Sequence, residues 1–218
     1  MSNYKIDLGC GYVKKPGCIG VDISNAPGVD IVLDIARNRL PFPEASVSYV
    51  FSSHFLEHVA DPTPIFAEIG RVASDGAKLE FWTPYAWSNS AFITDHKMFF
   101  NEDHYLHMCT WFVDFWRRIL NSSWLLTEIQ YVIERDVLVD LAQRGEDLNF
   151  ALRHYKGVVK EFCAHIEVRR ALDVKPVEPA RKWSLGRDEK KFRLPTVSAL
   201  SQAELDRAVA HFEGAYGK

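Results

Sequence analysis

The sequence predicts an α/β fold in which short buried strands build a mostly parallel sheet. The first observation is a series of short apolar runs, rich in valine and isoleucine, each closed by glycine, aspartate or serine. Such runs are typical of strands that are buried on both faces. The second observation is a segment with helical periodicity that follows these runs and leads into another one. Strands that alternate with a helix in this way indicate a layered α/β domain.

Five strands and one helix are expected in the first part of the chain. The expected strands are residues 4–8, 18–23, 30–35, 47–52 and 78–83. A helix is expected over residues 61–72, because Asp61 can cap it and Pro62 suits its first turn. The connection between the first two strands is much shorter than the roughly dozen residues of a normal crossover, so the usual first helix must be vestigial.

The middle of the chain is expected to contain an insertion. Aromatic residues gather between residues 81 and 116, together with His96, His104 and His107. This composition predicts a flap over the open end of the sheet, and a second core layer under a helix near residues 111–119 explains it equally well. Beyond it, residues 124–134 predict a sixth strand, and residues 136–162 a helical stretch interrupted near its glycines.

The C-terminal part is expected to complete a single domain. Residues 165–174 predict the seventh strand, and the charged, proline-punctuated segment 176–195 predicts a loop. Ser201 and Glu204 form a capping box that predicts a final helix through Phe212. The expected organisation is a first half with the parallel strands (1–84), a flap with a helical insertion (85–162), and the last strand with the C-terminal helix (163–218).

Composition narrows the class of protein. The 218 residues suffice for one good-sized core, and 47% hydrophobic with 25% charged residues is ordinary for a globular protein. A net charge of −3 argues against a general nucleic-acid binder. Four scattered cysteines without a C-x-x-C pair favour a reduced cytoplasm. Neither a signal peptide nor an apolar run long enough to span a membrane is expected.

The strongest chemical signal is the turn that closes the first strand. The run Ile6-Asp7-Leu8-Gly9-Cys10-Gly11 places two glycines where a buried strand ends. Glycine lacks a Cβ, so the chain can turn sharply and a ligand can approach the backbone. In open α/β sheets, ligands bind beyond the carboxyl ends of the strands. A glycine pair alone also occurs in simple turns, so the next two strands decide the interpretation.

Each of the next two strands ends in an aspartate. Asp22 closes the second run, where a carboxylate can accept both hydrogen bonds of a ribose diol. Asp34 closes the third run, where a carboxylate can accept a hydrogen bond from an adenine amino group. Each aspartate alone is as readily a cap or loop residue. Three successive strands that each deliver such a contact predict an adenosine-containing ligand.

The glycine turn does not fit a dinucleotide. The dinucleotide fingerprint is G-x-G-x-x-G with an acidic residue about 20 residues further on. Here Gly11 is followed by no third glycine in register, and Asp22 comes too early. A pyrophosphate also depends on a helix N-terminus for amide donors, whereas S-adenosylmethionine carries no phosphate. The vestigial helix therefore weighs against NAD.

The ordered motifs resemble class I S-adenosylmethionine-dependent methyltransferases, especially the group similar to methyltransferase type 11 domains. The resemblance covers roughly residues 4–84, and a short link between the first two strands is similar to a subgroup that often modifies sugars or cell-surface glycans. A Lys-Pro-Gly turn common in the family is replaced by Ser74-Asp75-Gly76. The matching segments are Asp7 to Gly11, Gly20 to Ile23, Asp34, and residues 40–43, 52–59 and 68–76.

The resemblance implies a Rossmann-like seven-stranded sheet whose last strand is antiparallel, and S-adenosylmethionine as the cofactor. No metal is predicted, because His104 and His107 with Asp95 or Asp103 match no strong metal motif. The expected cofactor-binding residues are Asp7, Gly9, Cys10, Gly11, Asp22, Ile23, Asp34, Ile35, Ser52, Ser53 and His54.

The catalytic residues are harder to predict, because a sulfonium methyl donor needs mainly alignment and exclusion of water. A base is needed when the acceptor is a hydroxyl, and less so for an amine. His96 in the expected flap is the preferred base, with His54 and Tyr85 as further candidates, while Glu57 and His58 are expected to be structural. Lys14 and Lys15 are expected to be solvated, or else to attract an anionic acceptor or the cofactor carboxylate.

The expected function is methyl transfer to a hydroxyl or amine of a small molecule, for example a sugar or glycan precursor. The alternatives are a non-catalytic module that binds S-adenosylmethionine, and an NAD-dependent oxidoreductase. The helical stretch 136–162 can serve as a flap or as a dimer contact, so a homodimer is among the expected assemblies.

Overall fold

The computed structural model describes residues 3–195 and 201–216, and these form one sheet of nine strands. The strand order is β3-β2-β1-β4-β5-β7-β6-β8-β9, and β7 runs antiparallel to both of its neighbours. The strands are β1 (Tyr4–Leu8), β2 (Ile19–Asp22), β3 (Ile31–Val32), β4 (Val47–Ser53), β5 (Ala73–Pro84), β6 (Ser123–Val132), β7 (Glu161–Arg169), β8 (Ala180–Ser184) and β9 (Phe192–Arg193). The predicted Rossmann-like sheet with an antiparallel seventh strand is confirmed.

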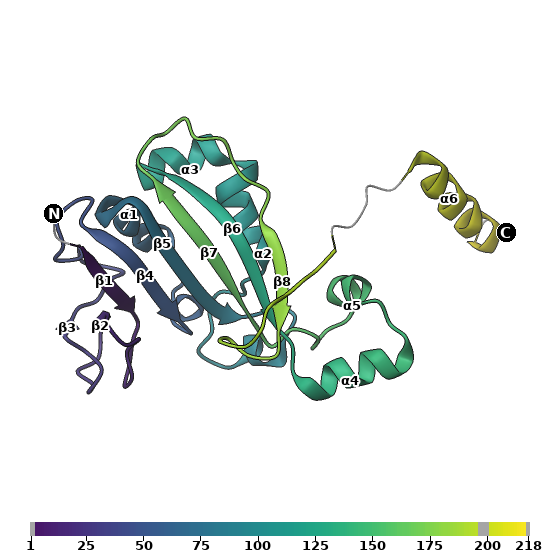
Figure 1. The fold of residues 1–218 in the computed structure, drawn as a ribbon, viewed down its shortest axis with the longest axis horizontal. Helices are drawn as coiled ribbons and strands as arrows, with labels where there is room; N and C mark the ends of the chain where they lie inside the picture. Colours follow the sequence, from purple (N-terminus) through teal and green to yellow (C-terminus); the bar gives the residue numbers. More distant parts are fainter. Residues whose placement is uncertain (1–2, 196–200, 217–218) are drawn as a thin grey trace.

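The helices between β4 and β6 cover one face of this sheet (Figure 1). The helix α1 (Thr63–Val72) leads from β4 to β5, and α2 (Glu102–Leu106), the π-helical turn η3 (His107–Trp111) and α3 (Val113–Leu120) lie between β5 and β6. The opposite face of the central strands carries no helix in the part of the chain that the structure describes. No helix forms between β1 and β2, which confirms the predicted loss of the usual first helix.

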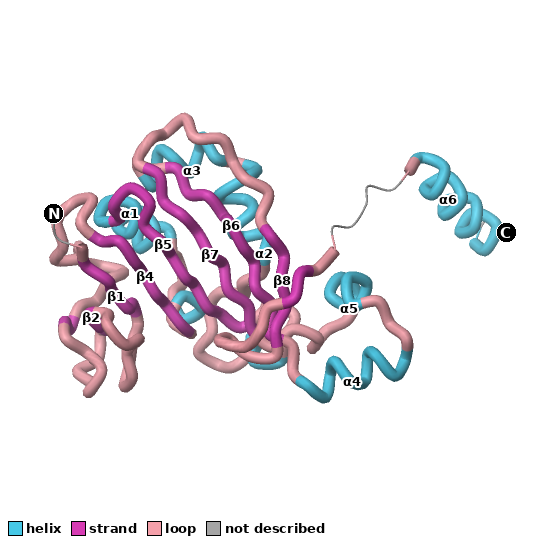
Figure 2. The backbone as a smooth tube through the Cα atoms, in the orientation of Figure 1, coloured by secondary structure: helices cyan, strands magenta, loops and turns pink. Residues whose placement is uncertain are grey.

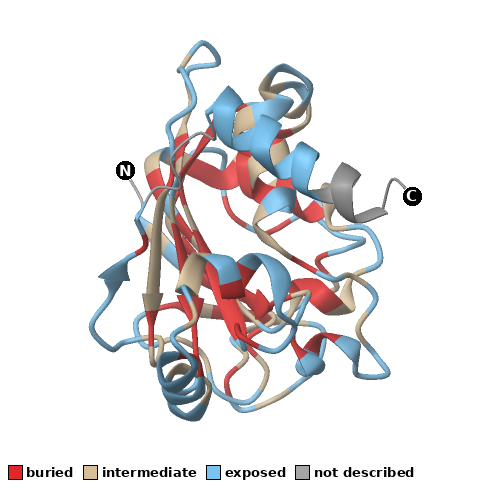
Figure 3. Ribbon diagram, turned by 90° about the vertical axis from the view of Figure 1, so that its right-hand side faces the viewer, coloured by how far each residue is buried: buried red, intermediate tan, exposed pale blue. Residues whose placement is uncertain are grey.

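The main core lies between the sheet and these helices. Phe66 of α1 packs against Phe81 of β5 and Trp124 of β6, with ring centroids 5.9 and 5.8 Å apart. The helices α1 and α3 approach closely at Gly70, where a Cβ would lie 2.1 Å from the carbonyl oxygen of Leu120. Figure 3 shows the buried residues concentrated in the sheet and in the elements packed on it. Burial on this face is what fixes the strand ends that carry the site.

Beyond β6 the chain adds the short helices α4 and α5, the antiparallel pair β8–β9 and the final helix α6 (Figure 2). The helices α4 (Arg135–Arg144) and α5 (Leu148–His154) form the predicted insertion, and Gly145 ends α4 with a φ of 67°. The final helix α6 (Gln202–Tyr216) begins at the predicted capping box, where the Ser201 amide donates to Glu204 Oε2 at 2.8 Å. No helix in the described ranges is both long and apolar enough to cross a membrane.

Two sequence-based expectations about the C-terminal part are wrong. The seventh strand begins at Glu161, earlier than residue 165, and residues 176–195 contain β8 and β9 where a loop was expected. The strand β8 escapes recognition because it is rich in charge, and its Lys182 pairs with Glu128 of the neighbouring β6. The sheet therefore has nine strands where seven were expected.

Candidate active site

The glycine turn after β1 is held under an aromatic ring. Gly9 has a φ of 69°, and a Cβ there would lie 2.2 Å from the Phe55 ring. The amide of Gly9 donates to the carbonyl of Val21 at 2.8 Å, which ties the turn to β2. Gly11 has a φ of 53°, and no atom lies within 4 Å of the position that its Cβ would take. The turn is thus packed on one side and open on the other, as a ligand-binding turn requires.

Asp7 lies at the end of β1, directly before this turn. Its side chain is buried, and its Oδ2 accepts a hydrogen bond from the backbone amide of Lys15 at 2.6 Å. Burial outweighs this bond and raises the pKa of Asp7 to about 6. Asp7 therefore fixes the short link that replaces the first helix.

Asp22 lies at the carboxyl end of β2 and faces the glycine turn. Its Oδ2 accepts from the Gly11 amide at 2.9 Å, and its Oδ1 accepts from the Ser24 amide and hydroxyl at 2.8 and 2.7 Å. Burial acts to raise the pKa of Asp22, but these hydrogen bonds outweigh it and hold the pKa below its usual value. An ionised carboxylate next to the open side of Gly11 has the character that a ribose diol requires.

Asp34 and two isoleucines complete the predicted adenosine-binding residues. Asp34 Oδ1 accepts from the Ala36 amide at 3.1 Å, and its Oδ2 lies 3.6 Å from Arg37 Nε. Ile23 is 67% exposed directly after β2, whereas Ile35 is buried in the main core. Ile23 offers an apolar surface at the strand end, and Asp34 holds the turn that follows β3.

The loop before β3 contacts the glycine turn, and this contact was not expected from the sequence. A Cβ on Gly28 would lie 2.8 Å from the carbonyl oxygen of Gly11, so the loop before β3 packs directly on the glycine turn. Cys10 Sγ donates to the Gly28 carbonyl at 3.4 Å, and burial raises the pKa of this thiol to about 11. Asp30 accepts from the Gly20 amide at 2.7 Å and pairs with Lys14.

The end of β4 brings the predicted Ser52, Ser53 and His54 to the same edge of the sheet. The hydroxyl of Ser52 is buried and donates to the Leu8 carbonyl at 3.0 Å. The hydroxyl of Ser53 accepts from Arg187 Nη1 at 2.7 Å. His54 has a φ of 52°, an unusual conformation for a residue other than glycine. Such strain often marks a functional strand end.

His54 lies between two carboxylates. Its Nε2 is 2.8 Å from Glu161 Oε2 and its Nδ1 is 3.1 Å from Glu57 Oε1. Hydrogen bonds to Glu161 and then to Glu57 raise the pKa of His54 to about 9. Burial would raise the pKa of Glu161, but hydrogen bonds from Arg187 and His54 hold it at about 2. At neutral pH this arrangement is a charged imidazolium clamped by two carboxylates.

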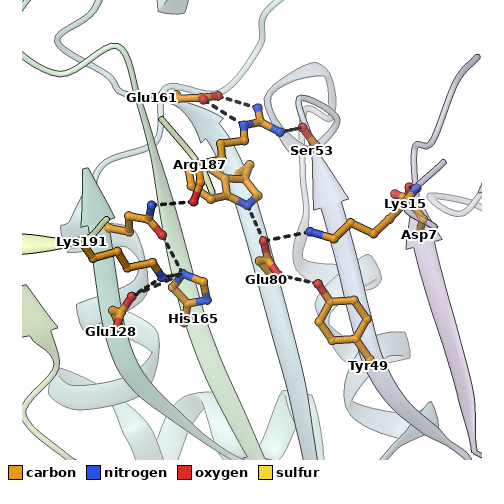
Figure 4. Close-up of polar contacts among 12 residues, drawn as sticks. Asp7, Lys15, Tyr49, Ser53, Glu80, Glu128, Glu161, His165, Arg187 and Lys191 are labelled. Carbon is orange, nitrogen blue, oxygen red and sulfur yellow. Dashed lines mark hydrogen bonds and ion pairs between the residues drawn. The ribbon is translucent and has the colours of Figure 1, made fainter. Parts of the chain in front are cut away.

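Polar groups cover the helix-free face beside these strand ends (Figure 4). Glu80 accepts from Trp82 Nε1 at 2.7 Å, pairs with Lys15 at 3.6 Å and accepts from the Tyr49 hydroxyl. The guanidinium of Arg187 lies 4.8 Å above the Trp82 ring. A cavity of about 270 Å³ opens between the Lys15 segment and Arg187, next to Ser53.

A larger cavity of about 500 Å³ lies on the helix-covered side, between the start of α1 and the α2–α3 segment. Its lining combines aromatic rings with carboxylate, amide and imidazole groups. Trp111 on its rim is 54% exposed. The lining residues are Ala60, Asp61, Pro62, Thr63, Phe66, Met98, Phe100, Asn101, Asp103, His104, Tyr105, His107, Met108, Trp111 and Trp116.

The remaining catalytic candidates differ in their surroundings. Tyr85 is buried, and its hydroxyl donates to Glu102 Oε2 at 2.8 Å. Burial, and then the charge of Glu102, raises the pKa of Tyr85 above its ordinary value. His96 is partly exposed; its Nδ1 donates to the Ala91 carbonyl at 3.2 Å, which leaves Nε2 as the acceptor. Of the two, only His96 has a free proton acceptor.

Two residues that lie far from His54 in the sequence, Glu161 and Arg187, were not predicted to belong to the site. Glu161 is 107 positions away from His54, and Arg187 lies in the segment that was expected to be a loop. Neither belongs to a local motif, so no signal in the sequence of one chain marks them. The charge at Glu161, directly before the apolar run from Phe162 to Ala164, is the one feature that could have drawn notice.

Residues 6–81 match a family model described as a methyltransferase domain. No curated protein matches the chain. The fold is similar to that of a SAM-dependent methyltransferase from Archaeoglobus fulgidus, with a TM-score of 0.53, 16% identity, and coverage of 77% of this chain and 86% of the other.

More distant likeness is found to geranyl diphosphate C-methyltransferase from Streptomyces coelicolor, solved with S-adenosyl-L-homocysteine, at a TM-score of 0.47 and 13% identity over 76% of this chain and 69% of that one. The family match covers the first strands of the sheet, and over most of the chain the fold is similar to that of an S-adenosylmethionine-dependent methyltransferase. The open glycine turn beside Asp22 fits S-adenosylmethionine, the cofactor that the matched methyltransferase domain implies.

Proposed function

We propose that this protein transfers the methyl group of S-adenosylmethionine to a hydroxyl or amine of a small polar molecule with a ring, such as a sugar or glycan precursor. The observation that carries the proposal is the cavity of about 500 Å³ beside α1. Asp61, Asn101 and Asp103 supply hydrogen-bonding groups to it, and Trp111 supplies an aromatic surface. Sugars present both hydroxyls and apolar ring faces, and this combination of groups suits them.

The proposed cofactor position follows the strand ends. Asp22 would receive the ribose hydroxyls, Asp34 the adenine amino group, and exposed Ile23 would pack on the adenine ring. The carboxylate of the methionine end would lie toward Ser53 and the cavity of about 270 Å³, and the sulfonium would lie at the strand ends, between the helix-free and the helix-covered face. Lys15 lines that cavity, so it is the cation that we assign to the cofactor carboxylate.

The proposed chemistry asks little of the protein beyond positioning. The bound cofactor supplies an electrophilic methyl group on a sulfonium. The chain's own residues must hold the acceptor in line and keep water out, and a base must take the proton from a hydroxyl acceptor. We assign this base to His96, which comes two residues before Met98 in the lining of the acceptor cavity, because its Nδ1–H is held by Ala91 and its Nε2 is free to accept. His54 is charged at neutral pH, so we assign it to holding the strand end.

The first test is calorimetry with S-adenosylhomocysteine, with NAD as the control. We expect micromolar binding of the first and none of the second. Binding of NAD alone would refute the proposal, and would favour the oxidoreductase alternative.

The second test is transfer of a labelled methyl group to a panel of sugars, sugar amines and small amines. His96→Ala is expected to lower kcat for hydroxyl acceptors by about 10²–10⁴-fold, the usual contribution of a general base. Its cofactor affinity should stay close to that of the wild type. His154→Ala, on the exposed surface of α5, is the matched control. Binding without transfer to any acceptor in the panel would favour the non-catalytic module.

Assembly and compartment form a further part of the proposal. Trp111, Phe112 and Phe115 are each more than half exposed around the start of α3, so we propose a homodimer that covers them. Sedimentation at several protein concentrations tests it, with Phe115→Ser as the variant expected to dissociate. The four cysteines are free and buried, which supports a reducing compartment such as the cytoplasm.

A further inference from the structure

Three side chains outside the proposed cofactor-binding residues converge next to the end of β4. Glu57 and His58 belong to the short helical turn η1 (Leu56–His58), and His96 comes from the segment after β5. Each offers one ligand atom, and these atoms lie within 4.8 Å of one another. The rings of His58 and His96 meet edge to face with centroids 4.8 Å apart. Two imidazoles and a carboxylate in one place are the donors that zinc prefers.

One carboxylate oxygen of Glu57 has no hydrogen-bond partner among the residues that the structure describes. The residue is only 2% exposed, and its Oε1 is engaged with His54 Nδ1 at 3.1 Å. Its Oε2 is buried and finds no hydrogen-bond partner within residues 3–195 and 201–216. A buried carboxylate oxygen without a partner carries a substantial free-energy penalty, so such atoms call for a specific explanation. A cation bound at this oxygen would remove the penalty.

Both histidines are oriented as metal ligands usually are. The carbonyl of Ala91 accepts from His96 Nδ1 at 3.2 Å, so that ring carries its proton on Nδ1. A carboxylate oxygen of Asp95 lies 3.1 Å from His58 Nδ1 and favours the same tautomer there. In both rings Nε2 is then a free lone pair. Metal-binding histidines almost always have the second ring nitrogen held by a carbonyl or a carboxylate in this manner.

The backbone holds the two contributing segments together. The amides of Lys97 and Met98 both donate to the carbonyl oxygen of Glu57, at 2.7 and 3.1 Å. The segment that carries His96 is therefore fixed to η1 by main-chain bonds that do not depend on a ligand. The arrangement is pre-organised, and only the partly exposed rings of His58 and His96 need to move for closure.

We propose that Glu57, His58 and His96 bind a divalent transition-metal ion of the zinc type. Ligand atoms around tetrahedral zinc are about 3.3 Å apart, given bonds of about 2.0–2.1 Å. The cluster must therefore tighten from its present spacing of up to 4.8 Å, which rotation of the two rings can supply. Two histidines and one glutamate leave a fourth position for water or for an oxygen of another molecule.

This inference goes beyond the proposed function and does not depend on the acceptor. In a metal-loaded protein Nε2 of His96 would be a ligand, so the base role that we assigned to His96 would apply to the metal-free protein. Metal binding can be measured without turnover, so its failure and the failure of the methyl-transfer proposal are separate results.

The test is titration of tag-free, chelator-stripped protein with Zn²⁺ in a calorimeter, and with Co²⁺ by its visible absorption. We expect one equivalent of Zn²⁺ in the wild type. His58→Ala and His96→Ala should each weaken binding by at least about tenfold, because each removes one of three ligands. His154→Ala, on α5 outside the cluster, should bind as the wild type does.

Glu57→Gln completes the set, since it removes the charge and keeps the shape of the buried side chain. Circular dichroism and thermal melting show whether each variant is folded, and the more exposed His58 and His96 variants serve if Glu57→Gln does not fold. Wild-type protein that binds no Zn²⁺ would overturn the inference. So would unchanged affinity in both histidine variants, since the ion would then be bound elsewhere.

Discussion

Asp22 is the residue on which the cofactor assignment depends most directly. Its two oxygens already organise the glycine turn and the Ser24 turn, and the carboxylate stays ionised between them. We expect Asp22→Ala to weaken binding of S-adenosylhomocysteine by roughly 1–3 kcal/mol, the contribution of a charged hydrogen-bonding partner. Calorimetry measures it, with the exposed Asp114→Ala on α3 as the control. Unchanged affinity would mean that the ribose binds elsewhere.

A pH dependence is expected from His54. Its pKa is raised to about 9 from 6.5, so the folded protein holds this proton more tightly than the unfolded chain does. The resulting stabilisation is fully present below pH 6.5 and is lost as the pH rises through about 9. Denaturant unfolding across this window should show falling stability in the wild type and a shallower fall in Glu161→Gln.

Glu134→Gln, which removes the exposed partner of Lys160, is the control for this pH experiment. NMR titration of the His54 ring gives an independent measurement, and a midpoint near pH 6.5 would contradict the prediction.

At the scale of residues, some parts of the site could be predicted from the sequence and others could not. The positions of the glycine turn, Asp22 and Asp34 at or near strand ends could be predicted, because local pattern reveals these strands, while their roles in cofactor binding stay predictions. The clamp on His54 could not, because Glu161 meets it only after the sheet has formed. The cluster of Glu57, His58 and His96 escaped for the same reason, since the first two were expected to be structural and His96 lies on a separate segment.

At the scale of elements, the packing of α1 on α3 sets a strict steric limit. A Cβ on Gly70 would meet the carbonyl oxygen of Leu120 at 2.1 Å, and a backbone atom cannot rotate away. We expect Gly70→Ala to lower the free energy of unfolding by about 1–3 kcal/mol, as overpacking does. Gly186→Ala, whose nearest neighbour is the Glu189 side-chain end at 3.1 Å, should change it much less. Equal effects in urea unfolding would contradict this account.

Elements were predictable where burial leaves a pattern and were missed where charge replaces it. The strands β1, β2 and β4 each contain a short apolar run that is buried and could be found from the sequence. The strand β8 lies next to the edge strand β9, and its Lys182 forms an ion pair with Glu128 of β6. Glu128 is far from Lys182 in the sequence and comes next to it only when the sheet forms. A search for hydrophobic runs therefore predicts a loop at β8.

At the scale of the whole molecule, α6 stands apart from the sheet (Figure 1). Residues 201–211 are all exposed, including Leu205 and Val209 at 47% each. Ending the chain at Pro195 is therefore expected to change the free energy of unfolding by no more than about 0.5 kcal/mol. Cofactor affinity should also be unchanged. A large loss in either measurement would show that α6 packs on the domain, in the same copy or in a second one.

The helix-free face of the sheet has a consequence for how stability varies with temperature. Helices cover one face only, whereas on the other face a small buried apolar cluster around Trp82 lies among ionised and hydrogen-bonded groups. Exposure of apolar surface is what makes the heat capacity of unfolding large, and exposure of polar surface lowers it. The heat capacity increment per residue should therefore fall below the usual value of about 12–15 cal/mol/K. The stability curve would then be flat and broad, so that the protein keeps a similar margin of stability over a wide range of temperatures.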